Sequence, residues 1–314
     1  MEKQSMIINN ILSNDNLNRA YKQVVNNKGA AGIDGMECEA LFSHLRTNGA
    51  QLKESIRNQA YNPLPVKRVE IPKEDGSKRN LGIPTVTDRL IQQAVAQVLT
   101  PIYEKVFYRN SYGFRPGKSA QQAVLKAVEY MNGGYNWVVD IDLEKFFDTV
   151  NHNKLISILN KEIKDGKVLS LIRKFLVSGV MVGEHVEETE IGTPQGGNLS
   201  PLLANIILNE LDWELEKRKL KFVRYADDCI ILVRSQKAAQ RVMDSISKYI
   251  ESKLLLKVNR KKSKIGRPIE IKYLGFTFYN QFKAKKYKAK AHEKSVQKVV
   301  RKWNDQRQTG SARR

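Results

Sequence analysis

The sequence predicts an α+β fold, in which amphipathic helices accompany antiparallel β-hairpins and the chain divides into two subdomains. The first observation is helical periodicity, as over 15–28, where apolar residues recur at the spacing of one helix face. The second is a pair of hairpins. Strand-like residues 66–72 and 78–83 are joined by a turn that contains glycine, and 221–225 and 229–233 flank two aspartates. Because these hairpins lie far apart in the sequence, we expect them in different subdomains.

The remaining elements follow from apolar spacing, capping residues and proline positions. Two short helices are expected over 38–58, before Pro63 and Pro65 end the helical stretch. Further helices are predicted, in chain order, over 87–106, from 119 onward, and over 152–160, 167–177, 199–219, 235–255 and 295–306. Strands are predicted over 136–141 and 272–279. This mixture of helices and separate hairpins is typical of the α+β class.

Positive charge is the strongest compositional signal. The 314 residues include 54 Lys and Arg against 33 Asp and Glu, a net charge of +21. From Lys257 onward there are 19 basic and 3 acidic residues, so most of the excess lies in the last fifth. Such a segment indicates a surface that follows a phosphate backbone. A solvated tail and an anionic membrane surface are the alternatives.

The same composition argues against several classes of protein. No apolar run approaches the roughly 18 residues of a membrane-spanning helix, so we expect no segment to span a membrane, and the motifs described below argue against a membrane surface as the partner. Two cysteines, Cys38 and Cys229, are too few for a disulfide framework or a four-cysteine zinc site, and the four histidines lack zinc-ligand spacing. We therefore expect a protein of the reducing cytoplasm, with access to nucleic acid.

Two acidic sites lie at the ends of predicted strands. Asp140 and Asp142 are two residues apart and so project from the same face of a strand, while Asp227 and Asp228 occupy a tight turn between apolar strands. Aspartate favours turns, which is the structural explanation of the second site. A strand end and a hairpin turn can also bring three carboxylates to a pair of hard cations. With the basic charge, this predicts two-metal phosphoryl transfer by a polymerase or a nuclease.

Six motifs, in order, resemble those of bacterial group II intron-encoded reverse transcriptases and maturases. They are RNLGIPT at 79–85, DRLIQQA at 88–94, YGFRP at 112–116, TPQGGNLSP at 193–201, YADD at 225–228 and YLGF at 273–276. The resemblance covers about 62–279, and it implies a right-hand polymerase fold with fingers and palm subdomains and an antiparallel palm sheet.

The family pattern also implies subdomain boundaries. We expect a helical N-terminal extension of the fingers over 1–60, fingers with a nucleotide-gripping hairpin over 61–135, and the palm over 136–280. A basic segment, 281–314, would lead toward a thumb that is largely absent. Either a truncated chain or a short relative would explain this length.

The resemblance assigns roles to individual residues. Asp142, Asp227 and Asp228 match the catalytic carboxylates that hold two Mg²⁺ ions, for which Mn²⁺ can substitute. Lys67 and Arg79 match cations that grip the triphosphate, Gln195 matches a sugar contact, and Phe147 matches the gate that excludes a ribose 2′-hydroxyl. Nucleic-acid contacts are expected at Arg115, Lys118, Gly196, Gly197, Lys262 and Lys264, where either Lys262 or Lys264 would protonate the leaving pyrophosphate.

These roles imply an RNA-directed DNA polymerase that adds dNTPs to a DNA primer while copying intron RNA, with a second role as a maturase. Two alternatives remain open at this point. One is a non-enzymatic splicing factor that binds intron RNA, and the other is a bacterial reverse transcriptase of retron, diversity-generating or CRISPR-linked type. The QGG run at 195–197 favours the intron type. The sequence leaves the oligomeric state open, including a homodimer.

Overall fold

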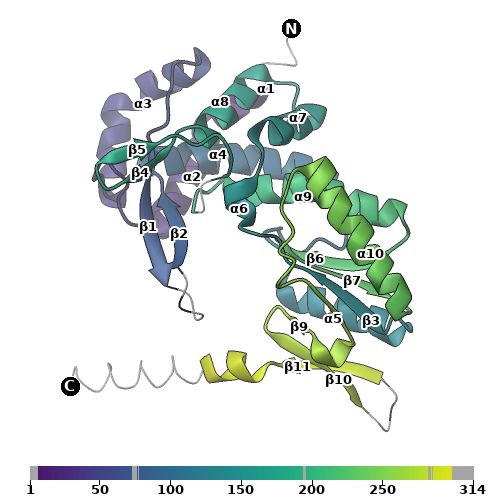
Figure 1. Ribbon diagram of the computed structural model, residues 1–314. Coiled ribbons are helices and arrows are strands. Elements are labelled where there is room, and N and C mark those ends of the chain that lie inside the picture. Colours follow the sequence, from purple (N-terminus) through teal and green to yellow (C-terminus); the bar gives the residue numbers. More distant parts are fainter. Residues whose placement is uncertain are drawn as a thin grey trace, which may run out of the picture. The chain divides into compact units, whose positions relative to one another are not determined.

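The computed structural model describes residues 6–72, 76, 78–193, 196–281, 284 and 286–298, without the side chain of Arg79 (Figure 1). The chain folds into two compact units, each assembled from separate segments. The first unit comprises Met1–Phe107, Lys145–Glu210 and Leu254–Lys257, and the second comprises Tyr108–Glu144, Leu211–Lys253 and Val258–Arg314. The α+β class expected from the sequence is confirmed.

Helices make up most of the first unit. α2 packs against α4, and the buried Asn16 joins them because its Nδ2 donates to the carbonyls of Ile11 and Ala94, each at 3.0 Å. The helices are α1 (Met6–Ile11), α2 (Asn14–Asn26), α3 (Leu41–Arg57), α4 (Val86–Tyr103), α6 (Phe146–Thr149), α7 (His152–Glu162) and α8 (Gly166–Leu176). α9 (Ser200–Lys217) runs on from this unit into the second.

The prediction of two short helices over 38–58 is wrong. A 3-10 turn, η2 (Cys38–Ala40), leads instead into the single long helix α3. Gly49 lies inside α3, where an isolated glycine costs only about 1 kcal/mol relative to alanine and does not end a helix with good formers on both sides.

A four-stranded sheet completes the first unit, in the order β2-β1-β4-β5. β1 (Val66–Pro72) and β2 (Lys78–Ile83) form the antiparallel hairpin that the sequence predicts, with Lys67 opposite Ile83. The sequence did not predict β4 (Val180–Val182) and β5 (His185–Glu187). Each has only three residues, and those of β5 are all exposed, so neither shows a hydrophobic pattern.

The second unit is built on an antiparallel sheet in the order β6-β7-β3-β8. The strands are β3 (Trp137–Ile141), β6 (Lys221–Tyr225), β7 (Asp228–Val233) and β8 (Lys264–Gly266). α5 (Ala120–Asn132) contributes Ala123, Ala127 and Met131 to a core that also contains Val138 and Ile230. α10 (Gln236–Tyr249) packs on β3, β7 and β8, and a π-helical turn, η3 (Ile250–Leu254), follows it. This sheet therefore carries the predicted carboxylates at the ends of two well-packed strands.

A second small sheet, in the order β11-β10-β9, follows the 3-10 turn η4 (Pro268–Glu270). Its strands are β9 (Lys272–Tyr273), β10 (Phe276–Gln281) and β11 (Lys286–Ala291). Tyr273 and Phe278 are buried in the core of the second unit. The helix predicted over 295–306 falls mostly outside the described residues. None of the helices that the structure describes is both long and apolar enough to cross a membrane.

Candidate active site

Four carboxylates gather at one end of the second unit's main sheet. Asp140 lies in β3 opposite Ile230, Asp142 directly follows β3, and Asp228 begins β7 beside Cys229, which pairs with Ile141. Side chains alternate along a strand, so Asp140, Asp142 and Asp228 belong to the same face of the sheet. Asp227 is the neighbouring residue, in the turn between β6 and β7.

These carboxylates interact electrostatically. Burial raises the pKa of Asp140 to about 6, with a further rise from Asp142, while Lys264 opposes the shift. The protein around Asp228 desolvates its carboxylate, although this residue keeps solvent access, and Asp227, Asp140 and Asp142 repel its charge. Together these effects raise the pKa of Asp228 to about 6. Burial and, after it, repulsion between the carboxylates therefore disfavour the charged forms of Asp140 and Asp228.

The donor set fits a hard divalent cation, because carboxylate oxygens are the ligands that Mg²⁺ prefers and a cation would relieve the mutual repulsion. Within the described ranges, no three His, Cys, Asp or Glu side chains already stand in a metal-holding arrangement. The two-ion site at Asp142, Asp227 and Asp228 therefore stays a prediction.

The turn that carries Asp227 and Asp228 is supported from within its own unit. Ala226 has a left-handed backbone with φ +54°, which is uncommon for a residue other than glycine. The Nη1 of Arg224 donates to the carbonyl of Ala226 at 2.8 Å. Gly113 packs so closely that a Cβ there would lie 2.2 Å from the nitrogen of Ala226. Nothing in the sequence indicates that Arg224 holds this turn, because an arginine within an apolar strand carries no motif of its own.

The first unit has a cavity of about 310 Å³ beside its hairpin. Phe147, half-buried in α6, lines this cavity together with Arg68, Asn80 and Gly82 from β1 and β2. Thr193, next to the predicted sugar-contact motif, lines it as well. Phe147 and the β1–β2 hairpin thus line one cavity, and the role of Phe147 as a gate stays a prediction.

The structure does not place the other predicted nucleotide contacts, Lys67, Arg79 and Gln195, at this cavity. Lys67 is exposed and does not line the cavity as the structure describes it. Its neighbour Arg68 does. Arg79 pairs with Ile71 through the backbone, and its side chain lies outside the described part of the chain, as does the whole of Gln195. The roles of Lys67, Arg79 and Gln195 stay predictions.

Gly196 and Gly197 are both explained by contacts within the protein. Gly196 has φ +117°, and a Cβ there would lie 2.5 Å from the carbonyl oxygen of Gly82 in β2. At Gly197 a Cβ would lie 2.6 Å from Oε1 of Gln92. These contacts alone explain why glycine stands at both positions. The predicted contact of Gly196 and Gly197 with nucleic acid stays a prediction.

The remaining predicted contacts lie in the second unit. Arg115 is buried, and its Nη1 donates to the carbonyls of Tyr108 and Ser111 at 2.7 and 2.9 Å, which favours a role in its own loop. The Nζ of Lys118 lies 5.1 Å from the ring centre of Tyr112. Lys262 is exposed, and Lys264 pairs with Asp140 across β8 and β3. Of the two candidates for a proton donor, Lys264 lies beside the carboxylate cluster.

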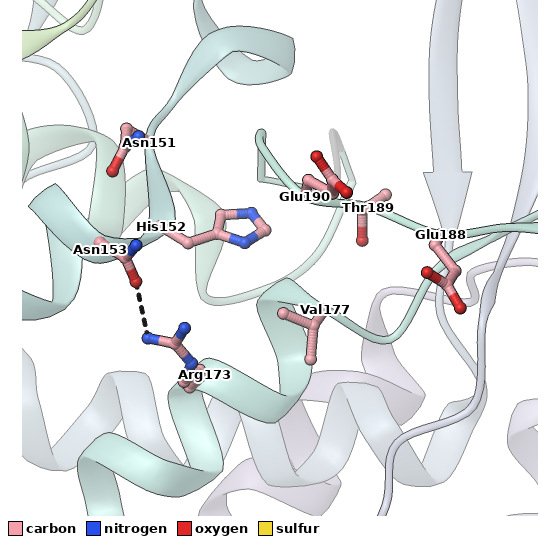
Figure 2. A pocket seen from close by; sticks show the side chains of 8 residues that line it. All are labelled: Asn151, His152, Asn153, Arg173, Val177, Glu188, Thr189 and Glu190. Carbon is pink, nitrogen blue, oxygen red and sulfur yellow. Dashed lines mark hydrogen bonds between the residues drawn. The ribbon is translucent and has the colours of Figure 1, made fainter.

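A second cavity of the first unit, of about 480 Å³, contains none of the predicted site residues among those that line it (Figure 2). His152 is directed into it from the start of α7, toward the segment that carries Thr189 and Glu190. The imidazole nitrogen Nε2 lies 2.6 Å from the carbonyl oxygen of Gly192. The sequence indicates no role for this histidine, because its partner is 40 residues away.

Comparison with known proteins identifies the family. Residues 71–278 match the family model of the reverse transcriptase (RNA-dependent DNA polymerase). The chain is 42% identical over 212 residues to the group II intron-encoded protein LtrA of Lactococcus lactis subsp. cremoris, covering 67% of this chain but only 35% of LtrA. It is 32% identical over 290 residues to protein YkfC of Escherichia coli, covering 79% of this chain and 76% of YkfC.

A solved structure gives the same fold. Telomerase from Candida albicans has a TM-score of 0.54 at 15% identity, covering 70% of this chain and 45% of that chain. At this identity the likeness concerns architecture, and it confirms the right-hand polymerase fold. On the family match, the relatives and this fold, the chain belongs to the reverse transcriptase family, as a member of its group II intron-encoded branch.

Proposed function

We propose that this chain is an RNA-directed DNA polymerase that copies intron RNA in the bacterial cytoplasm. The observation that carries the proposal is the cluster of Asp140, Asp142, Asp227 and Asp228 at one end of the sheet, where burial, and after it the neighbouring carboxylates, raise the pKa of Asp140 and Asp228 in a strongly basic protein. In the reaction, the primer 3′-oxygen loses its proton and bonds to the α-phosphorus of a dNTP. The bond to the β-phosphate oxygen breaks, and pyrophosphate leaves.

Each group of residues has a part in this proposal. Asp142, Asp227 and Asp228 would hold two Mg²⁺ or Mn²⁺ ions, which supply charge stabilisation and a more acidic primer hydroxyl. Phe147 would exclude the ribose 2′-hydroxyl, and Lys67, Arg79 and Gln195 would position the triphosphate and sugar. Segment 61–135 would act as fingers and 136–280 as the palm. Lys264, paired with Asp140, is our choice for the group that protonates pyrophosphate.

Primer extension tests the polymerase activity. The protein is incubated with an RNA template, an annealed DNA primer, dNTPs and Mg²⁺, beside an Asp227→Asn variant that removes one charge without changing side-chain size. We expect the variant to lose at least about a hundredfold in rate, since a metal contributes several kcal/mol at such a site. Asp244→Asn, on the exposed side of α10, is the matched control. No incorporation by the unaltered chain, or equal rates for Asp227→Asn, would refute the proposal.

A maturase role is the second candidate, and one face of β11 favours it. Lys286, Lys288 and Lys290 are exposed and alternate along the strand. Across the β10–β11 pairing, Lys288 stands opposite Tyr279 and Lys290 opposite Thr277. The other face, with Tyr287 and Ala289, packs against the core. Because β11 has one buried and one lysine-rich face, it can dock on a phosphate backbone without disturbing the fold.

The lysines can be tested by salt-dependent RNA binding. Replacing each of the three with alanine is expected to reduce the slope of log affinity against log salt by about 1 per lysine, uniformly across RNA sequences. Lys237→Ala, on the exposed side of α10, serves as control. Specific recognition is a separate question. It requires that the protein bind the folded parent intron more tightly than another structured RNA of equal length, and equal affinities at every salt concentration would exclude it.

A further inference from the structure

The backbone of 191–193 is fastened to α6 and the residues that follow it. The amide of Gly192 donates to the carbonyl of Val150 at 2.8 Å, and the amide of Thr193 donates to the carbonyl of Phe147 at 2.6 Å. Ile191 forms an isolated bridge with Asn151. The position of the Phe147 main chain is therefore coupled to the path of this stretch.

Gly192 shows how little space this arrangement leaves. Its φ is +98°, and a Cβ there would lie 3.1 Å from the carbonyl oxygens of both Phe147 and Asp148. A residue with a side chain could occupy this position only if the 191–193 stretch moved away from α6. The backbone of 191–193 and the backbone of α6 therefore lie unusually close together, and specific bonds must hold them there.

His152 supplies a bond at this point. The side chain is only 4% exposed, and its Nε2 lies 2.6 Å from the carbonyl oxygen of Gly192. A carbonyl can only accept, so Nε2 carries the hydrogen and donates it. The same glycine is therefore held on both sides, by Val150 through its amide and by His152 through its carbonyl.

Two cavities of the first unit lie along this stretch. Ile191, Gly192 and Thr193 line the 310 Å³ cavity that Phe147 also lines. His152 lines the 480 Å³ cavity, and Thr189 lines both (Figure 2). His152 thus reaches Gly192 from outside the cavity that contains Phe147, and it can affect that cavity without touching a bound nucleotide.

We propose that His152 is a positioning residue for sugar selection: its hydrogen bond to the Gly192 carbonyl fixes 191–193 against Phe147 and so sets the depth of the cavity beneath the nucleotide sugar. This inference rests on the proposed polymerase function and on Phe147 as the gate. A steric gate depends steeply on distance, so a small relaxation admits the ribose 2′-hydroxyl. A deoxynucleotide, which lacks that oxygen, gains nothing from the extra space.

The test is the ratio of kcat/KM for dGTP to that for GTP on one RNA template with a DNA primer. His152→Phe keeps a ring of similar size without the donor, His152→Gln keeps an N–H donor, and His185→Ala, in the exposed strand β5, is the control. We expect the phenylalanine variant to lower the ratio by about threefold to tenfold, mainly through faster use of GTP. The glutamine variant is expected to retain most of the selectivity, and the control all of it.

Each outcome separates the two hypotheses. If the unaltered protein incorporates neither nucleotide, the proposed function fails and this inference with it. If the unaltered protein selects dGTP but His152→Phe does so equally well, or if the phenylalanine and glutamine variants lose selectivity alike, only the role of His152 is overturned. Should His152→Phe not fold, His152→Ala takes its place. If neither donor-free variant folds, His152 serves stability alone and the inference fails.

Discussion

The guanidinium group of Arg224 binds both carboxylate oxygens of Asp212, with Nε 2.7 Å from Oδ1 and Nη2 2.5 Å from Oδ2. Neither side chain is exposed to solvent. The remaining Nη1 donates to the carbonyl of Ala226, the left-handed residue before Asp227. The ion pair therefore connects α9 directly to the turn that carries two of the proposed metal ligands.

The first prediction concerns this pair. Asp212→Ala would leave the Arg224 charge buried without its partner, so we expect a loss of about 3–5 kcal/mol in the free energy of unfolding. Glu214→Ala breaks the Glu214–Arg218 pair on the exposed side of the same helix and is expected to cost no more than about 1 kcal/mol. Urea unfolding measures both. Equal losses in the two variants would show that burial does not matter here.

A second prediction concerns Gly113, which packs against the same turn. In Gly113→Ala the new methyl group would meet the nitrogen of Ala226, so the turn must shift and primer extension should fall by at least about tenfold. Gly166→Ala, at a position with open space, should leave extension unchanged. Circular dichroism checks that both variants fold. Full extension by a folded Gly113→Ala variant would show that the carboxylates tolerate movement of the turn.

The gate gives a third prediction. Phe147→Ala removes a ring that lines the cavity, so we expect kcat/KM for ribonucleotides to rise by about tenfold to a hundredfold, with a small change for deoxynucleotides. Single-nucleotide incorporation with dGTP and GTP measures both values. Phe42→Ala, which removes an exposed ring from α3, is the control. Unchanged discrimination in Phe147→Ala would exclude this residue as the gate.

The fourth prediction is a pH dependence of stability. Burial lowers the pKa of His152, the nearby Arg173 lowers it further, and the bond to Gly192 opposes both effects. The unfolded chain, with a histidine pKa of about 6.5, then takes up the proton first as the pH falls. The stabilisation from neutral His152 is therefore complete above about pH 6.5 and is lost as the pH drops through the lower, folded-state pKa.

Melting curves between about pH 8 and pH 5 measure this effect. The unaltered protein should lose more stability on acidification than His152→Gln, whose side chain does not titrate. Parallel curves for the two proteins would contradict the prediction.

Much of the fold could be predicted because its signals are local. The β1–β2 hairpin, the strand β6 and the helices α2 and α5 follow from alternation, turn residues and apolar spacing, and the expected start near residue 119 agrees with the cap Ser119. The carboxylates at the end of β3 and in the β6–β7 turn were found in the same way. In contrast, β4 and β5 are too short to show a period, and the break expected between two helices within 38–58 is absent, because α3 continues through Gly49.

The supporting residues could not be predicted, because they act through contacts that only the folded chain creates. Asp212 and Arg224 are on different elements, and His152 and Gly192 are separated by a strand pair and two helices. An aspartate in a helix and a histidine after an asparagine give no signal by themselves. Asp140, noted for its spacing from Asp142, acquires its role through burial and through Lys264.

The interleaving of the two units has a consequence for how the protein is made. β3 takes both of its partners, β7 and β8, from segments that follow it much later in the chain. At a synthesis rate of about 5–20 residues per second, the strand that carries Asp140 is made roughly 4–17 s before β7. During such an interval its backbone edges have no partner strand, so aggregation during translation is a risk that falls on the strand the proposed catalytic centre needs. Slower decoding of the segment between them would prolong that exposure.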